Sequence, residues 1–360
     1  MRVLILAKHL GSALGGIEIQ CELLARQLVQ AGHAVFYGAA GGGEELSATY
    51  PIEAWTPGDT AQTLALIQRT QPNVIYLRHN KIALRRTARC AARAGVPLVF
   101  AASSLQDVQA WSFHRKHVAW TPARIASVAW QRVKSRWNWS GFRWVSAAVS
   151  LNPDYTQRLP VKRRRHIADA MESIAEPFQW PRRYVAWVAQ LKDYKNPGDF
   201  VELARRCADL DIDFLMAGEV VSARYEWIAK GVNVPSDFHY LGRITPRQVN
   251  GLLQSAAALV HTCDPEGFGN NFIQAWQQGT PTLSLRFDPA GIIERERLGA
   301  VPGDMDGLER ALRALLADED ARLRTGERAR AYARVHHDPA TTTQQLVDLF
   351  QEVIAAGGAR

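Results

Sequence analysis

The strongest constraint on the fold is a pattern of short β-rich runs that alternate with helical segments and then restart after the midpoint. In the first half, apolar residues recur at helical spacing over residues 17–31 and again over residues 82–94. The β-rich runs between these helices are residues 3–6, 34–37, 73–77 and 97–101. Strands that alternate with helices predict a parallel, doubly wound sheet, so the fold class is α/β.

The second half repeats this alternation. Its β-rich runs are residues 184–189, 214–217, 238–241, 259–261 and 282–285. Asn196-Pro197 predicts a helix start with Asn as the cap, and Thr245 opens a capping box that ends at Gln248. A length of 360 residues suits two domains of similar size. We therefore expect two Rossmann-like domains with a cleft between them, over residues 1–170 and 171–338, and a helix over 339–360 that packs back on the first domain.

Composition excludes several classes of protein. Hydrophobic residues make up 47% and charged residues 22% of the chain, which is typical of a folded globular protein. The apolar run in residues 1–8 is too short for a signal peptide, and no stretch approaches the ~18 apolar residues of a membrane-spanning helix. The four cysteines form no C-x-x-C pair, so neither a disulfide framework nor a zinc site is indicated. We expect a cytoplasmic protein with no cofactor and no bound metal.

Two loops that precede helices are suited to bind phosphate. The turn over residues 11–18 contains Gly15 and Gly16, and glycines let backbone amides at a helix start approach a phosphate closely. Lys195 follows the first strand of the second half and precedes a helix, where a lysine can neutralise a diphosphate. Each also has a simpler interpretation, a tight strand–helix turn for the glycines and a solvated loop residue for the lysine.

The third segment, residues 264–281, places a carboxylate in a loop before a helix. Glu266 precedes Gly267-Phe268-Gly269, and Asn270 and Asn271 lie in the first helical turn. Gln274 follows them at helical spacing, so these amides share one face with the positive end of the helix dipole. Such a face suits a sugar diphosphate. The simpler interpretation is a glutamate that stabilises the helix start, with asparagine as the cap.

At these residues the chain resembles glycosyltransferase family 4, which has the GT-B fold. The resemblance spans nearly the whole chain and is most specific at Glu266-Gly267-Phe268-Gly269 with Gly279-Thr280-Pro281. It implies a retaining, metal-independent transferase of hexosyltransferase type, in which Glu266 contacts the donor sugar, Lys195 the diphosphate and Gln274 the ribose. Glu266 and Lys195 are thus the implied catalytic residues. The implied donor-binding residues are Gly15, Gly16, Gln190, Lys195, Gly218, Glu219, Gly242, Arg243, Glu266, Gly267, Phe268, Gly269, Asn270, Asn271 and Gln274.

The chain departs from the family pattern at three places. Gln274 stands where a glutamate is usual, and a glutamine still accepts a hydrogen bond from a ribose hydroxyl. Gln190 replaces an arginine, which removes a cation from the diphosphate. The family's histidine on the acceptor side is absent from its expected place, where Ser103, Ser104 and Asp107 form the loop. These three residues are therefore the candidates on the acceptor side.

A basic, tryptophan-rich segment covers residues 111–165. It contains twelve lysines or arginines and one acidic residue, Asp154, so it carries +11 while the whole chain carries +8. Six of the eleven tryptophans also lie here. Tryptophan prefers the lipid headgroup region and cations prefer anionic lipid, so the segment predicts contact with an anionic membrane. The alternative is that the tryptophans are buried and the arginines solvated. No RNA-binding signature is present, so nucleic acid is not expected as a partner.

The sequence thus predicts a retaining glycosyltransferase that moves a sugar from a nucleotide-sugar to a glycan or lipid-linked acceptor. We expect it to act in cell-surface polysaccharide or lipopolysaccharide biosynthesis, as a peripheral protein on the inner face of the cytoplasmic membrane. The main alternative is a catalytically inactive GT-B protein that binds a glycan or a partner transferase. A nucleotide-sugar epimerase of the same fold is a third interpretation.

Overall fold

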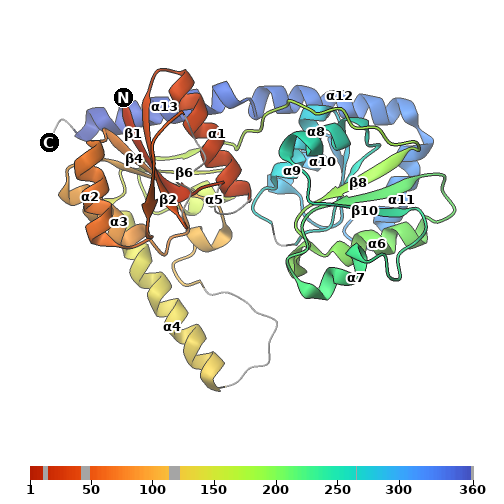
Figure 1. Cartoon of the computed structure of the whole chain (residues 1–360), viewed down its shortest axis with the longest axis horizontal. Helices are drawn as coiled ribbons and strands as arrows, with labels where there is room; N and C mark the ends of the chain where they lie inside the picture. The colour runs from red at the N-terminus through yellow and green to blue at the C-terminus, as the bar shows by residue number, and fades with distance from the viewer. Residues whose placement is uncertain (11–14, 42–48, 113–121, 265, 358–360) are drawn as a thin grey trace. The chain divides into compact units, whose positions relative to one another are not determined.

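The computed structural model describes residues 1–10, 15–41, 49–112, 122–264 and 266–357 and divides the chain into two compact units (Figure 1). Unit 1 comprises Met1–Asp169 together with Pro339–Arg360, and unit 2 comprises Ala170–Asp338. Among the described residues, no helix has both the length and the apolar character that crossing a membrane requires.

Unit 1 is built on a seven-stranded parallel sheet with the strand order β3-β2-β1-β4-β5-β6-β7. Its elements are β1 (Arg2–Lys8), α1 (Gly16–Gln30), β2 (Ala34–Ala40), β3 (Ile52–Trp55), α2 (Thr60–Thr70), β4 (Val74–Arg78), α3 (Leu84–Arg93), β5 (Leu98–Ala102), α4 (Pro122–Trp139), β6 (Ala147–Ser150), α5 (Pro153–Arg158), β7 (Arg164–His166) and α13 (Pro339–Gly357). The order runs outward in both directions from β1 and β4, as in a doubly wound sheet.

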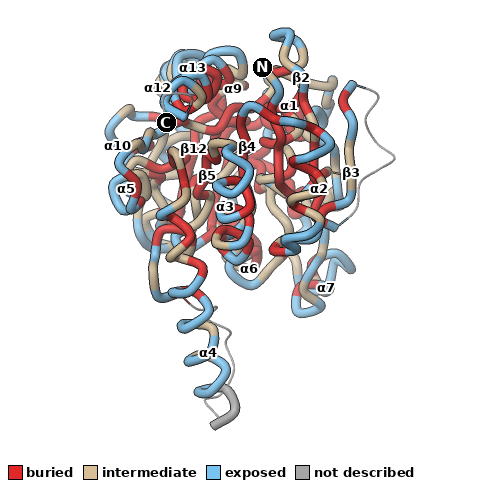
Figure 2. Tube along the Cα trace, turned by 90° about the vertical axis from the view of Figure 1, so that its left-hand side faces the viewer, coloured by how far each residue is buried: buried red, intermediate tan, exposed pale blue. Residues whose placement is uncertain are grey.

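Alternation along the strands of unit 1 produces two apolar layers. Val3 and Ile5 face a cluster that includes residues of α1 and α13, whereas Leu4 and Leu6 face a cluster that includes residues of α2 and α3. Side chains of a strand point alternately to opposite faces, so one apolar run supplies both layers. Figure 2 shows the buried residues concentrated along the sheet strands, while α4 is largely exposed.

Unit 2 is built on a six-stranded parallel sheet with the order β10-β9-β8-β11-β12-β13. Its elements are β8 (Tyr184–Val188), α6 (Pro197–Arg206), β9 (Asp213–Ala217), α7 (Glu226–Ala229), β10 (Phe238–Gly242), α8 (Pro246–Ser255), β11 (Leu259–His261), α9 (Asn270–Gln278), β12 (Thr282–Ser284), α10 (Ile292–Arg295), β13 (Gly299–Ala300), α11 (Met305–Ala317) and α12 (Glu319–His336). The order reverses between β8 and β11, which makes these neighbours the switch point of the sheet, where open α/β sheets bind ligands.

The fold class expected from the sequence is confirmed, whereas some elements were not predicted and one helix cap was predicted incorrectly. No element was predicted at β3, α2, α4, β6 or β7, nor at the shorter α5, α7, α10 and β13. Asn196 does occupy the cap position of α6, but its backbone is left-handed (φ 46°) and its side chain makes no capping hydrogen bond. Its amide donates instead to the carbonyl of Thr262 at 3.1 Å, so the predicted side-chain cap is wrong.

Candidate functional site

The loops after β8 and β11 bring two charged side chains together in unit 2. Lys195 is the last residue of a short 3-10 turn after β8, and Glu266 lies between β11 and α9. The Lys195 ammonium donates a hydrogen bond to the Glu266 carboxylate. Both side chains are mostly buried, with 16% and 17% of their surface exposed. The pair therefore lies at the switch point between β8 and β11, the expected place for a ligand.

Thr262 ties these two loops together independently of the ion pair. Its hydroxyl donates to the carbonyl of Lys195 at 2.8 Å and accepts from the Trp187 indole at 2.9 Å. The Trp187 ring is fully buried in the core of unit 2. The backbone of Lys195 is thus anchored to the core, and a ligand that displaces its side chain from Glu266 leaves this anchor intact.

Lys195 and Glu266 keep each other ionised although both are mostly buried. Burial raises the pKa of the Glu266 carboxyl, but the charge and hydrogen bond of Lys195 outweigh it and hold that pKa below its ordinary value of 4.5. Burial likewise lowers the pKa of Lys195, and Glu266 reverses this and raises the pKa above 10.5. At neutral pH the pair is an ammonium and a carboxylate. A phosphate that binds Lys195 competes with Glu266 for the donors of the ammonium.

The N-terminal half of α9 is attached to neighbouring elements through side-chain amides. The Asn271 amide donates to the carbonyl of Val188, at the end of β8, at 3.0 Å. The Gln274 amide donates to Asn250 Oδ1 at 2.9 Å and to the carbonyl of Pro246 at 3.3 Å, both in α8. Gln274 therefore has a structural partner in α8 as well as its implied role at a ribose.

The residues between Glu266 and α9 differ in their surroundings. The Gly267 N–H donates to Glu266 Oε1 at 3.2 Å. Gly269 precedes α9 with φ 91°, and a Cβ there would lie within 3.0 Å of Asn271 and Phe272 atoms, so the turn requires glycine. The Phe268 ring packs against Trp276 and His337 in an aromatic cluster. Phe268 thus holds the loop from the core side. Asn270 is the first residue of α9, and Pro265 lies outside the described residues.

Five further residues implied by the resemblance gather at the carboxyl ends of β8, β9 and β10. Gly218 N–H donates to the carbonyl of Gly242 at 2.8 Å, and the carbonyl of Glu219 accepts from Leu191 N–H at 2.8 Å. A Cβ on Gly218 would lie 1.7 Å from the carbonyl oxygen of Ala189, next to Gln190. Only glycine permits this close approach of the loops after β8 and β9. Arg243 is exposed beyond the end of β10.

In unit 1 the predicted glycine turn is described only in part. Gly15 is the cap of α1 in an extended conformation, and Gly16 is the first residue of that helix. Residues 11–14 lie outside the described residues. A Cβ on Gly15 would meet the Glu18 carboxylate at 2.5 Å, so an acidic group already lies against this helix start.

The three acceptor-side candidates, which also belong to unit 1, form one local network. The Asp107 carboxylate is buried and accepts from the backbone N–H groups of Ser103 (3.2 Å), Ser104 (3.0 Å) and Lys81 (3.0 Å). It also accepts from the Ser104 hydroxyl at 2.9 Å. Burial raises the pKa of Asp107 even though these hydrogen bonds lower it. This network orders the loop after β5, which is a structural task for Asp107.

Sequence reasoning missed several polar residues at the ends of strands. Arg78 ends β4 and donates to both carboxylate oxygens of Asp169 at 2.8 Å in a buried pair. His79 follows Arg78, with its ring edge-on to Trp55. The available signal was a cation and a histidine directly after a predicted parallel strand.

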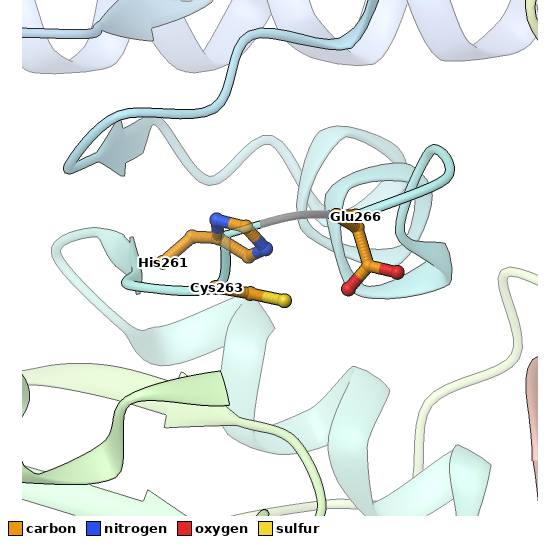
Figure 3. A group of neighbouring side chains, drawn as sticks. All are labelled: His261, Cys263 and Glu266. Carbon is orange, nitrogen blue, oxygen red and sulfur yellow. The ribbon is translucent and has the colours of Figure 1, made fainter. Parts of the chain in front are cut away.

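A cluster of potential metal ligands was missed as well. His261, Cys263 and Glu266 converge in unit 2 (Figure 3). The spacing of cysteines alone could not reveal this group, because it contains one cysteine and two ligands of other types.

Residues 172–332 are similar to a known family. These residues match the family model described as glycosyl transferases group 1. A curated relative is the D-inositol 3-phosphate glycosyltransferase of Corynebacterium glutamicum (strain R), which is 26% identical over 185 residues. The match covers 48% of this chain and 44% of that relative, so the chain matches less than half of the relative's length.

Solved structures show the same fold over nearly the whole chain. The sucrose-phosphate synthase from Thermosynechococcus elongatus superposes with a TM-score of 0.75 at 16% identity, covering 99% of this chain and 100% of that one. WaaG, a glycosyltransferase involved in lipopolysaccharide biosynthesis, gives a TM-score of 0.66 at 14% identity, covering 97% and 99%. At these identities the likeness concerns the fold, and it confirms the expected GT-B architecture of two Rossmann-like units.

Proposed function

We propose that this chain, whose residues 172–332 match the family model of glycosyl transferases group 1, moves a hexose from a nucleotide-sugar to a glycan or lipid-linked acceptor. In this proposal the configuration at the sugar carbon is retained and no divalent metal takes part. The observation that carries the proposal is the Lys195–Glu266 pair at the switch point of the second sheet, beside the first turn of α9.

Each residue of this pair has a distinct role. The diphosphate of the donor replaces Glu266 as the partner of the Lys195 ammonium, and the amides at the start of α9 add positive potential. The released Glu266 carboxylate accepts hydrogen bonds from hydroxyls of the donor sugar. Lys195 and the amides then stabilise the charge that develops on the leaving diphosphate, an effect whose loss costs about 3–4 kcal/mol per donor. A phosphate oxygen of the leaving group takes the acceptor's proton, so no protein nucleophile is needed.

We also propose that the acceptor belongs to a cell-surface glycan such as lipopolysaccharide, and that the protein acts at the inner face of the cytoplasmic membrane. The description of WaaG supports the first part. The second part is supported by the exposed apolar and basic residues of α4, such as Trp130 and Arg132. A lipid-linked acceptor would then be taken from the membrane.

Calorimetry with UDP, GDP and ADP in excess chelator tests the proposal. We expect one diphosphate to bind without metal. Glu266→Gln should keep this binding and lose sugar transfer, whereas Glu226→Gln, an exposed control in α7, should keep both. Binding that disappears with chelator would contradict metal independence. Diphosphate binding without transfer or donor hydrolysis by the wild-type chain would favour the inactive, glycan-binding alternative.

A further inference from the structure

A second set of polar groups meets Glu266 on the side of β11. The imidazole of His261, the thiol of Cys263 and the carboxylate of Glu266 each offer one ligand atom, and these atoms lie within 4.8 Å of one another. In Figure 3 the three side chains point toward a common space. His261 and Cys263 are 3% and 2% exposed, so a ligand would reach them past the more exposed Glu266.

The hydrogen bonds around His261 indicate which nitrogen of its neutral imidazole carries the proton. The Ser284 hydroxyl donates to the carbonyl of Phe287 at 2.5 Å and lies 3.2 Å from His261 Nδ1. The Ser284 oxygen is therefore left to accept from an Nδ1–H group, and Nε2 carries the lone pair. His261 Nε2 is buried and has no hydrogen-bond partner among the described residues. A neutral imidazole held at Nδ1, with its other nitrogen unpartnered, has the arrangement of a metal-binding histidine.

The combination of ligands indicates the ion. Imidazole, thiolate and carboxylate together suit Zn²⁺, whose bonds to them are about 2.0–2.3 Å long. Around a tetrahedral ion such bonds separate the ligand atoms by about 3.3–3.6 Å. A separation of up to 4.8 Å thus has to close by at most about 1.2–1.5 Å, which small movements of the side chains can supply. Binding would release the thiol proton of Cys263 to solvent and leave the fourth position to water.

We propose that His261, Cys263 and Glu266 form an inhibitory site for Zn²⁺, in which the ion replaces Lys195 as the partner of Glu266. A Glu266 carboxylate bound to zinc cannot accept hydrogen bonds from a donor sugar. The cation site stands on the three side chains alone, whereas the inhibition rests on the function proposed above for Glu266.

Metal binding by the untagged, reduced and chelator-stripped chain tests the site directly. We expect one equivalent of Zn²⁺ to bind in competition with a chromophoric chelator, and Mg²⁺ not to compete. Co²⁺ in place of zinc should give the near-ultraviolet absorption of a thiolate–cobalt bond. Cys263→Ser and His261→Asn should each weaken zinc binding by more than about 100-fold. Cys207→Ser removes another buried cysteine of unit 2 and should change neither signal.

The outcomes separate the site from the enzyme's activity. Equal zinc affinity in wild type and Cys263→Ser, or equal loss in Cys207→Ser, would overturn the site. Circular dichroism checks that each variant is folded. If Cys263→Ser does not fold, the zinc affinity of His261→Asn tests the site in its place. Zinc should weaken binding of the nucleotide-sugar more than binding of the nucleoside diphosphate. Equal affinities with and without zinc would overturn the inhibition. If the chain transfers no sugar, the function fails, while zinc titration still decides the site.

Discussion

Lys195 pairs with the Glu266 carboxylate in the structure, and a bound diphosphate would take the place of this carboxylate. We expect Lys195→Ala to weaken binding of a nucleoside diphosphate about 10- to 150-fold, the equivalent of a charge-assisted hydrogen bond of about 1.5–3 kcal/mol. Binding of the nucleoside should be unchanged, since it has no phosphate. Calorimetry of both ligands measures the difference, with the exposed Lys230→Ala as the control. Equal losses for the two ligands would show that Lys195 acts through the fold.

The same ion pair predicts a pH dependence of stability. The pKa of Glu266 is lowered in the folded chain, so its contribution to the unfolding free energy is complete above the ordinary value of 4.5. The contribution should fall as the pH drops below 4.5 and vanish below the folded pKa. Because the pKa of Lys195 is raised, its contribution is complete below the ordinary value of 10.5 and is lost as the pH rises above it. The difference in unfolding free energy between wild type and Glu266→Gln should therefore be constant from pH 5 to 9 and shrink in acid. A difference that grows in acid would contradict the ionised pair.

Gln274 gives a third prediction, because its donors already have partners. The Asn250 amide donates to the carbonyls of Glu172 and Ile174 at 2.8 Å, so its Oδ1 cannot turn away from Gln274. Gln274→Glu would place a carboxylate against this oxygen and the carbonyl of Pro246. We expect a loss of about 1–3 kcal/mol in unfolding free energy. The exposed Gln248→Glu in α8 is the control, because it makes the same change of group and its carboxylate can still accept from Thr245 N–H in the capping box. Unchanged stability would show that α9 shifts to accommodate the carboxylate.

The sequence predicted the residue types of the site better than their contacts. Lys195 and Glu266 were each recognisable from a loop between a strand and a helix, and parallel strands bring such loops to one edge. Their direct pairing was not predictable, since it depends on β8 and β11 being neighbours despite the strands between them in sequence. The partner of Gln274 in α8 was hidden for the same reason.

At the scale of elements, α4 has an unusual distribution of side chains. Trp130, Val133 and Trp137 recur at helical spacing and are 67%, 55% and 43% exposed. Ser135 and Asn138, which lie on other sides of the helix, are buried. The helix thus turns apolar side chains outward, the distribution expected for a helix that lies in a membrane interface.

Substitutions on α4 test the proposed membrane contact. The neighbouring cations Arg132, Lys134 and Arg136 are exposed, and each is worth about 1 kcal/mol near an anionic surface. Their joint replacement by serine should lower affinity for anionic vesicles on the order of 100-fold at low salt and flatten the salt dependence. Trp130→Ser should lower affinity and leave the salt slope unchanged. Sedimentation measures both.

A matched control uses an exposed apolar residue outside α4. Val335 in α12 is 64% exposed, and Val335→Ser should leave vesicle binding as in wild type. Trp139 also lies in the tryptophan-rich segment, but it packs against Phe142 and is unsuitable for this test, because its loss would disturb the core. Equal recovery of wild type with neutral and anionic vesicles at low salt would contradict the membrane role and favour a soluble acceptor.

Two of the missed elements, β7 and α4, lack the inward-facing apolar pattern by which a packed element is recognised. β7 consists of Arg164, Arg165 and His166, an edge strand with no apolar residue, so it carries no pattern of burial. The apolar residues Trp130, Val133 and Trp137 of α4 have helical spacing, but they face solvent instead of a core. The central strands were predictable because burial on both faces requires continuous apolar runs.

At the scale of the whole molecule, unit 1 is discontinuous in sequence. Its C-terminal helix α13 follows all of unit 2 and contributes to the core cluster beneath β1 and β4. An ion pair also joins the helix to the sheet, since Arg165 of β7 donates a hydrogen bond of 2.5 Å to Glu352 of α13. Unit 1 can therefore complete its core only after all of unit 2 and α13 have been synthesised.

The final prediction follows from this discontinuity. Phe350 is fully buried, and its ring packs edge-on against the ring of Tyr76 in β4, with 5.9 Å between the ring centroids. Phe350→Ala should lower the stability of unit 1 by about 3–5 kcal/mol, a large fraction of the roughly 5–15 kcal/mol that a domain typically has. Leu323→Ala in α12, where the side chain is 49% exposed, is the control and should change little. Hydrogen exchange measures the two units separately, and the loss should appear in residues 1–169 and spare 170–338. Equal loss of protection in both units would show that they unfold together, so that α13 stabilises the whole chain through unit 1.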